Sequence, residues 1–361
     1  MRTLSSEETA AFGAELDALR AGVLADLGQR DVDHIRRMVR LVRYSETGGR
    51  ALLHFGIGPI TFAVGTSLLG AAKILENMEV GHNIMHGQYD WTGDPALRGA
   101  DYEWDTACTG DDWRHSHNVE HHTFTNVLGR DRDVGYGLLR ISPKQRWHPK
   151  HLAQPIAAAL LALLFQWGVG LHDLHLTEAL SGSDPDARAK LKTRARPFLR
   201  KAAWQLGKDY ALFPLLAGLN APRVFAGNLL ANLARNVWSF AVIFCGHFPA
   251  GTEIYPESVL DGETRGAWYL RQLNGSANIE GSRAFHIASG HLSHQIEHHL
   301  FPDLPAARYP ELAPRVREIC ERYGQHYNTG SFAAQLGSVA TQIVRNALPS
   351  QVRLTPSSEI M

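Results

Sequence analysis

The sequence predicts an all-α protein: an integral membrane helical bundle with a cytosolic helical cap that holds a di-metal site. Apolar residues recur at helical intervals through much of the chain. Several apolar runs approach the length that crosses a bilayer core of about 30 Å. Of the 19 histidines, many fall into three short clusters. Neutral imidazole is the commonest protein ligand for transition metals, and three clusters exceed the need of one tetrahedral zinc ion.

The composition narrows the class of protein. The 361-residue chain has 36 basic and 36 acidic residues, a balance that argues against a nucleic-acid partner. Its three cysteines are far apart and form no Cys-x-x-Cys pair, so neither a disulfide scaffold nor a thiolate metal site is indicated. The polar start of the chain lacks the apolar core of a signal peptide.

Residues 1–50 are expected to form an N-terminal cytosolic helical arm. Ser5 and Glu8 have the spacing of a capping box at the start of a first helix. A second helix is predicted from residue 33 to about residue 44, with several arginines. This arm is interpreted as a solvated amphipathic segment.

Residues 51–323 are expected to form the membrane domain, with 324–361 as a C-terminal tail. The first apolar run, 51–72, contains Gly56, Gly58 and Pro59, which should break or kink it. The tail from Leu348 onward is expected to be disordered.

The predicted topology rests on the charge of residues 181–203 and on an even number of membrane crossings between the histidine clusters. Residues 181–203 read as a loop with seven Lys or Arg against two Asp, and the positive-inside rule places this loop in the cytosol. All three clusters lie on the cytosolic side if 156–176 is an interfacial helix and 204–246 a two-helix hairpin. The number of crossings in 51–80 stays open.

The clusters repeat one spacing. His-x-x-x-His-His occurs at His117, His121 and His122, and again at His294, His298 and His299. On a helix, positions i and i+4 share a face, whereas an adjacent residue is rotated by about 100°. An adjacent pair can therefore address two metals. With His82 and His86 the set suits two five- or six-coordinate irons.

The remaining histidines divide by position. His247 ends an apolar helix on the side of the clusters and is predicted to be a further ligand. Three others lack the repeated spacing and are expected to orient ligands or to be structural: His115, His286 and His291. Five more are expected to be ordinary: His34, His54, His148, His151 and His326.

The carboxylates disfavour one kind of metalloprotein and exclude another. A soluble di-iron carboxylate bundle needs two Glu-x-x-His motifs, and Glu79-x-x-His82 is the single one. His-Glu-x-x-His is absent, which excludes a zincin protease. Four acidic residues are candidate acceptors for the outer nitrogens of ligand imidazoles or, equally, loop caps or solvated charges: Asp131, Asp133, Glu120 and Glu297.

The three clusters resemble, in order and spacing, the histidine boxes of the membrane fatty acid desaturases. Gln295-Ile-Glu-His-His-Leu-Phe-Pro302 is similar to the third box of front-end and acyl-lipid members. His121-His-Thr-Phe-Thr-Asn126 resembles the second box, and the segment from Glu76 to His86 resembles bacterial acyl-CoA or acyl-lipid desaturases. The resemblance extends from about residue 51 to about residue 323.

The resemblance implies oxygen-dependent desaturation of a fatty acyl chain, carried by coenzyme A or by a lipid, at a non-haem di-iron centre in the cell membrane. It implies seven iron ligands from the boxes, with His247 at the family's extra ligand position: His82, His86, His117, His121, His122, His298 and His299. Ile243 stands where related animal enzymes have an Asn that contacts iron through water. The chain has no fused haem motif, so a separate ferredoxin or similar donor, with its reductase, is implied.

Two other functions stay open. A fatty acyl or alkane hydroxylase shares the boxes, and a metal transporter or non-catalytic iron-binding membrane protein would also gather histidines. Basic residues of 181–203 are interpreted first as a topology signal, and otherwise as a contact for a charged headgroup or an acidic donor.

The first ligand of the third box is a choice between two neighbours. Family resemblance favours Gln295, because front-end members use Gln at that spacing. The spacing within this chain favours His294, which stands four residues before His298, as His117 does before His121. The prediction is therefore His294 as the ligand, with Gln295 as its hydrogen-bonding neighbour.

Overall fold

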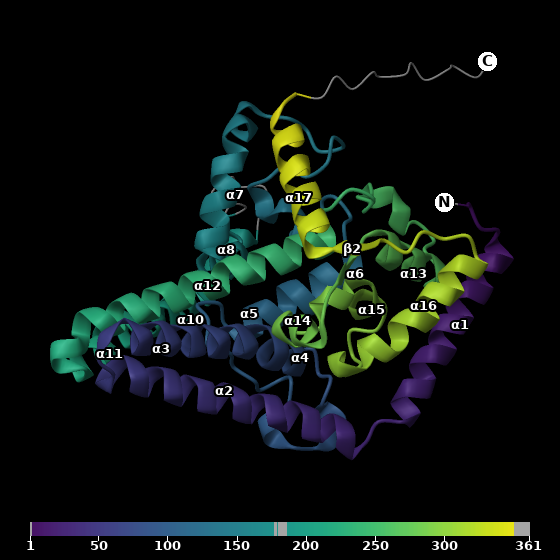
Figure 1. Cartoon of the computed structure of the whole chain (residues 1–361). Coiled ribbons are helices and arrows are strands. Elements are labelled where there is room, and N and C mark those ends of the chain that lie inside the picture. The colour runs from purple at the N-terminus through teal and green to yellow at the C-terminus, as the bar shows by residue number, and fades with distance from the viewer. Residues whose placement is uncertain (1, 177–178, 180–185, 350–361) are drawn as a thin grey trace.

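The computed structural model describes residues 2–176, 179 and 186–349. Helices make up nearly all of its regular structure, and two three-residue strands form the one sheet among the described residues. The all-α prediction is therefore confirmed. Figure 1 shows a long bundle of α2, α3 and α12 that leads into a cluster of shorter helices, with α7 and α17 packed together above it and α1 and α16 at the far end.

The N-terminal arm consists of α1 (Ser6–Ala25) and α2 (Gln29–Phe55). The predicted capping box is present, since the Ser5 side chain accepts from the Glu8 backbone and the Glu8 side chain accepts from that of Ser5. However, α2 extends well beyond the predicted end near residue 44. It packs along α3 (Gly58–Leu75), so the predicted boundary at residue 50 falls inside a helix of the bundle.

The break between α2 and α3 lies at Gly56 and Ile57, where the expected glycine and proline signals stand. Two glycines allow the helices to approach closely. A Cβ added to Gly49 would lie 2.8 Å from the Gly65 carbonyl oxygen and 2.8 Å from the Leu69 backbone nitrogen. The hairpin therefore depends on the missing side chain at this crossing.

The predicted hairpin over 204–246 is present in outline. Its second leg is α12 (Ala221–His247), a long apolar helix that packs against α3. Its first leg is broken into the end of α10 (Ala187–Gly207), a π-turn (Lys208–Leu212), α11 (Phe213–Leu216) and a 3-10 turn (Gly218–Asn220). The segment from residue 187 is thus a helix and not the expected loop, and 181–185 lie outside the described residues.

Charged side chains interrupt that first leg and are paired inside the bundle. Lys73 Nζ lies 2.9 Å from Asp209 Oδ2, and Lys208 Nζ lies 2.9 Å from Asp105 Oδ2. All of these are buried except Asp105, which is partly exposed. Pairing makes burial of these charges tolerable.

The expected interfacial helix over 156–176 is two helices. A 3-10 turn (Pro149–Ala153) leads into α7 (Gln154–Leu163), and α8 (Phe165–Asp173) follows after a bend of 98°. The bend lies at Leu164, whose backbone leaves the helical region with ψ at 25°.

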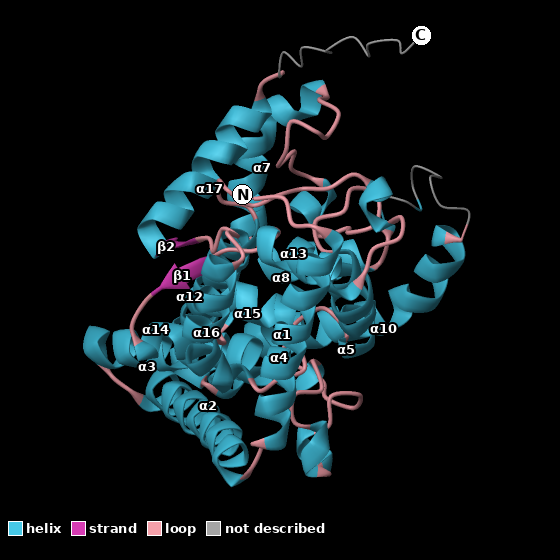
Figure 2. Ribbon diagram, turned by 90° about the vertical axis from the view of Figure 1, so that its right-hand side faces the viewer, coloured by secondary structure: helices cyan, strands magenta, loops and turns pink. Residues whose placement is uncertain are grey.

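The predicted C-terminal tail contributes to the domain. Its β2 (Thr329–Ser331) pairs in parallel with β1 (Asn278–Glu280), and α17 (Phe332–Ala347) packs against α7 and α12. Figure 2 shows the two strands between α17 and α12. Residues 350–361, expected to be disordered, lie outside the described residues.

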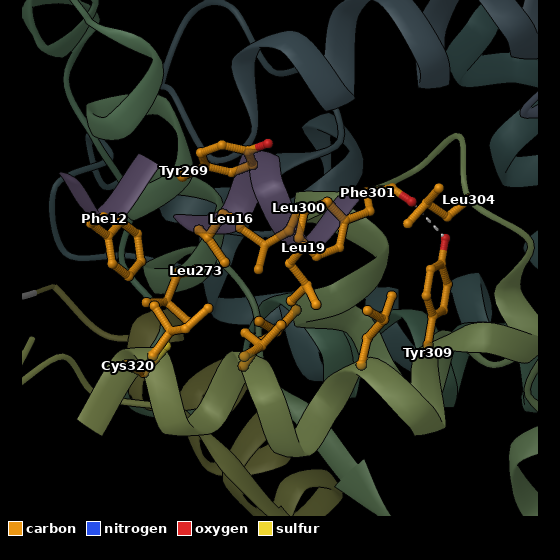
Figure 3. Close-up of a cluster of buried hydrophobic side chains, with 14 of the residues drawn as sticks. Phe12, Leu16, Leu19, Tyr269, Leu273, Leu300, Phe301, Leu304, Tyr309 and Cys320 are labelled. Atoms are coloured by element: carbon orange, nitrogen blue, oxygen red, sulfur yellow. Dashed lines mark hydrogen bonds between the residues drawn. The ribbon is translucent and has the colours of Figure 1, made fainter. Parts of the chain in front are cut away.

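A buried apolar cluster anchors the third histidine segment. It joins α1, α13 (Arg265–Asn274), α15 (Gln295–Leu300) and α16 (Tyr309–Arg322) (Figure 3). Leu300 and Phe301 follow the last two histidines of the segment directly and are almost fully buried in this cluster. The packed core therefore holds the backbone that carries these histidines.

Two helical stretches in the described residues are long and apolar enough to cross a membrane, Gly58–Met85 and Gly218–His247. The bent pair α7–α8 would make a third if it counts as one span. At the end where α2 turns into α3, the helical bundle exposes large apolar side chains, including Ile57, Ile60 and Leu219. Such exposure is expected for a surface covered by lipid.

Candidate metal centre

One histidine segment lies on a π-helical turn, and another directly follows one. α3 continues through the π-turn Glu76–Gly81 into α4 (His82–Met85), and α5 (Gly110–Trp113) continues through the π-turn Arg114–His121 into α6 (His122–Phe124). Such bulges shift the register of a helix and are frequent at functional sites. The third segment begins with a 3-10 turn (Leu292–His294) that leads into α15, just after α14 (Arg283–Ala288).

The tertiary structure brings seven of the nine predicted ligands together in two groups, with His122 beside them. The ligand nitrogens within each group lie within 4.8 Å of one another. The first group contains His82, His86, His117 and His298, and the second contains His121, His247 and His299. His122 lies between the groups: its Nε2 is 3.3 Å from that of His117, and its ring stacks on His299 at 4.5 Å.

Several of these imidazole nitrogens have no hydrogen-bond partner. Among the described residues, six buried nitrogens of the predicted ligands are unpaired: His86 Nε2, His121 Nε2, His122 Nδ1, His247 Nδ1, His298 Nε2 and His299 Nε2. Buried polar atoms are normally paired, and leaving one unpaired costs about 1–3 kcal/mol. Unpaired buried nitrogens on rings that lie in two close groups fit metal ligation.

The opposite ring nitrogens are held by neighbouring side chains. His121 Nδ1 lies 3.0 Å from Asp131 Oδ2, and His299 Nδ1 lies 3.0 Å from Gln272 Oε1. His298 Nδ1 is 3.4 Å from the Tyr309 hydroxyl. Partners of this kind fix the tautomer, so that the inner nitrogen is free to ligate.

Burial determines the protonation of the rings outside the apolar spans. It lowers the pKa of His122, His298 and His299 well below the usual value, and neighbouring imidazoles add to the effect. Burial also acts to lower the pKa of His121, but the Asp131 carboxylate outweighs it and raises that pKa. Neutral imidazole is the form that binds a metal.

His294 is not in either group, and the helical spacing on which its prediction rested is wrong. The predicted helix shared by His294 and His298 does not exist, because α15 begins at Gln295 and His294 has φ −104° and ψ 57°. The His294 ring instead lies 4.5 Å from that of His286. The argument from i and i+4 spacing fails for this reason.

Gln295 points to the second group. Its Nε2 lies 3.0 Å from His247 Nε2, and its Oε1 is buried without a partner. Because a half-turn of the amide exchanges Oε1 and Nε2, either atom can face the centre. The position that the family resemblance favoured is the one beside the histidines.

The other histidines lie outside the two groups. His115 is exposed and lies 3.3 Å from Glu120, and His286 contacts Ser293 at 2.8 Å. His172 was not singled out, yet it lies 3.2 Å from Asp133, which also contacts His117 at 3.8 Å. The Asp133 position was among the expected acceptors, but nothing in the local sequence indicated that His172 would meet it.

A narrow cavity adjoins the histidines. Its apolar wall includes Trp104, Trp113, Phe165 and Phe248, and it reaches four of the grouped histidines: His82, His117, His121 and His247. The Trp113 ring stacks on His117 at 4.4 Å. Asp133, Asp173 and Arg235 also line the cavity, but an aromatic wall beside ligating groups suits the apolar part of a substrate.

A helical membrane protein with buried, converging histidines is the class that this fold and site define. Comparison with known proteins identifies the family within that class. The sequence profile described as "Fatty acid desaturase" matches residues 58–331. This chain therefore belongs to the fatty acid desaturase family and is an oxidoreductase of that family.

The most informative relative is bacterial. An "NADPH-dependent stearoyl-CoA 9-desaturase" of Mycobacterium tuberculosis is 44% identical over 344 residues, which covers 94% of this chain and 80% of the relative. An "sn-1 linoleoyl-lipid 6-desaturase" of Synechocystis is 28% identical and covers 78% of this chain and 80% of the relative. An "Acyl-lipid (8-3)-desaturase" of Rebecca salina is 29% identical over 71% of this chain and 59% of the relative.

Proposed function

We propose that the protein converts a saturated long-chain acyl-CoA to its 9-monounsaturated product, with dioxygen as oxidant. The observation that carries this is the cavity whose aromatic wall adjoins the grouped histidines. The Mycobacterium relative, a stearoyl-CoA 9-desaturase by name, supports the carrier and the bond position. Overall the acyl chain loses two hydrogens, and dioxygen with two electrons and two further protons becomes two molecules of water.

Two iron ions are proposed for the two histidine groups, where they would supply the dioxygen and redox chemistry. His82, His86, His117, His122 and His298 would hold one ion. His121, His247 and His299 would hold the other, with Gln295 beside them. The unpaired nitrogens and their outer partners support this assignment.

The residues of the chain position and shield the substrate. Trp104, Trp113 and Phe165 form an apolar part of the cavity wall, and such a surface favours contact with an acyl chain over contact with water. When the acyl chain is held in one register, one pair of its carbons lies beside the histidines. This positioning is the main contribution that the cavity makes to the reaction rate.

A second pocket is the proposed site of the coenzyme A moiety. It has a volume of about 1430 Å³, and Trp104 lines both pockets. Arg196 and Arg200 of α10 line it and make no ion pair with any residue that the structure describes. Guanidinium groups suit the phosphates of the carrier, whereas a lipid without such a headgroup would leave them without a ligand.

Electrons are proposed to come from NADPH through a separate redox protein. The name of the Mycobacterium relative supports NADPH as the source. A ferredoxin with its reductase, expected from the sequence, is one form that this partner can take.

The test is expression in a cell that lacks its own acyl desaturase, followed by mass spectrometry of the fatty acids. We expect an alkene between carbons 9 and 10, and none from a His298→Ala variant. An alcohol, which has gained one oxygen, would identify a hydroxylase instead. Unchanged fatty acids in spite of a metal-loaded protein would overturn the proposal in favour of a non-catalytic metal protein.

The carrier is tested with purified protein and the double variant Arg196→Ala/Arg200→Ala. We expect KM for stearoyl-CoA to rise about tenfold or more with little change in kcat, because the two lost phosphate contacts together remove about 1.4 kcal/mol or more of binding. Equal kinetics for variant and parent would contradict this site.

A further inference from the structure

Three side chains outside the two histidine groups converge at one point. Glu79 lies on the π-turn before His82, His34 lies on α2, and His291 lies in the turn before the third histidine segment. His34 Nε2 is 2.6 Å from Glu79 Oε1, and His291 Nδ1 is 2.9 Å from Glu79 Oε2. One ligand atom from each of the three lies within 4.8 Å of the others.

Among the described residues, the carboxylate at this point is buried with no Lys or Arg beside it. Glu79 is 1% exposed, and within the described ranges both of its oxygens are bonded to imidazoles and to no Lys or Arg. A buried carboxylate must be neutralised by a paired charge or a metal ion. Two imidazoles and one carboxylate form a donor set that zinc uses in proteins.

The backbone that presents His291 is unusual. His291 has φ 58°, in the left-handed region that few residues other than glycine adopt, and Gly290 before it has φ 64°. A Cβ on Gly290 would lie 2.2 Å from the Met78 carbonyl oxygen. The turn is thus pressed against the residue before Glu79, and it directs the His291 ring to that carboxylate at a conformational cost.

We propose that His34, Glu79 and His291 bind a third metal ion, a divalent first-row cation of the zinc type, independent of the two histidine groups. Bonds of about 2.0–2.2 Å to nitrogen and oxygen would require the present contacts to open by less than about an ångström. His34 is partly exposed, which gives the ion a path from solvent and water access to a fourth position.

The ion would connect three parts of the chain. It would join the N-terminal α2 to the helix that carries His82 and to the turn that leads into His298. None of its three ligands belongs to the two histidine groups. The site therefore stabilises the arrangement of two ligand segments without itself contacting the substrate cavity, whose lining excludes all three residues.

Elemental analysis of the purified, detergent-solubilised protein tests this site. We expect three transition-metal ions per chain in the parent and two in His34→Ala and in His291→Asn. Asparagine tolerates the left-handed backbone at 291, so this variant removes the imidazole while the turn is kept. His54→Ala is the matched control, because His54 lies on the same helix and its hydrogen bonds go only to backbone carbonyls; we expect three ions.

Electron cryomicroscopy of the parent gives a second measurement that needs no variant. We expect a density peak bonded to His34, Glu79 and His291. Two ions per chain in the parent, or a map in which the carboxylate contacts the two rings with no peak between them, would overturn the proposal. The cluster would then be an ion pair with a protonated imidazole.

Discussion

The side chains around each ligand imidazole determine what its two nitrogens can do. Asp131 shows this most clearly, since it contacts His121 Nδ1 and accepts from the backbone N–H of Asn126 at 2.7 Å. It is 4% exposed, so the carboxylate is fixed on both sides. Asp131 therefore orients the ring through a contact that touches no substrate.

Asp131→Asn is expected to lower activity about 10–100-fold, the usual cost of removing an outer partner of a metal ligand. Metal content should fall in the second group more than in the first. The measurement is turnover together with metal per chain. Glu257→Gln, which removes an exposed ion pair with Arg130 on the surface, serves as a control that should leave both unchanged.

Single-residue variants also test whether His294 or Gln295 is the ligand of the third histidine segment. Gln295 adjoins His247, whereas the His294 ring faces His286. Gln295→Ala should therefore lower metal content and activity more than His294→Ala does. The opposite order, with His294→Ala devoid of metal, would restore the spacing argument.

At the scale of elements, the close crossing of α2 and α3 positions the first histidine segment, because α3 continues directly into it. Gly49 has no room for a side chain, since a Cβ at this position would lie 2.8 Å from backbone atoms of α3. Gly48, its neighbour, would meet nothing closer than a Leu68 methyl at 3.8 Å.

Gly49→Ala should destabilise the protein by about 1–3 kcal/mol through overpacking. Gly48→Ala should be neutral or stabilise it by about 0.4–1 kcal/mol, because alanine restricts the unfolded chain. Thermal unfolding in detergent compares the two variants. Equal melting temperatures would show that the helices separate easily at this crossing.

For the whole molecule, the two apolar stretches Gly58–Met85 and Gly218–His247 place all grouped histidines toward one end of the bundle. We propose that this end faces the cytosol, where acyl-CoA and NADPH are found. The charge of residues 187–203 supports this orientation, since cytosolic segments near membranes carry excess Lys and Arg.

Cysteine labelling tests this orientation. The three native cysteines are buried, so a cysteine at Asp261, which is exposed beyond the histidine end of α12, should react selectively. Asp261→Cys should resist a membrane-impermeant maleimide in intact cells and react after permeabilisation. Labelling in intact cells would reverse the topology.

The sequence by itself determined the helical class, the break at Gly56 and the candidate ligands of the three histidine segments. These features are encoded locally, by apolar periodicity, by glycine and proline, and by the spacing of ligating side chains. The resemblance to desaturases added the family, and comparison with known proteins confirmed it.

Only the tertiary structure decided how the histidines divide between two groups and which neighbour of the third segment faces them. Spacing rules assume a continuous helix, but π-turns shift the first two segments and a 3-10 turn precedes the third. The contact of His34 with Glu79 joins residues 45 positions apart, and that of His291 with Glu79 joins residues 212 apart. No local pattern encodes such contacts, because they arise from the packing of whole helices.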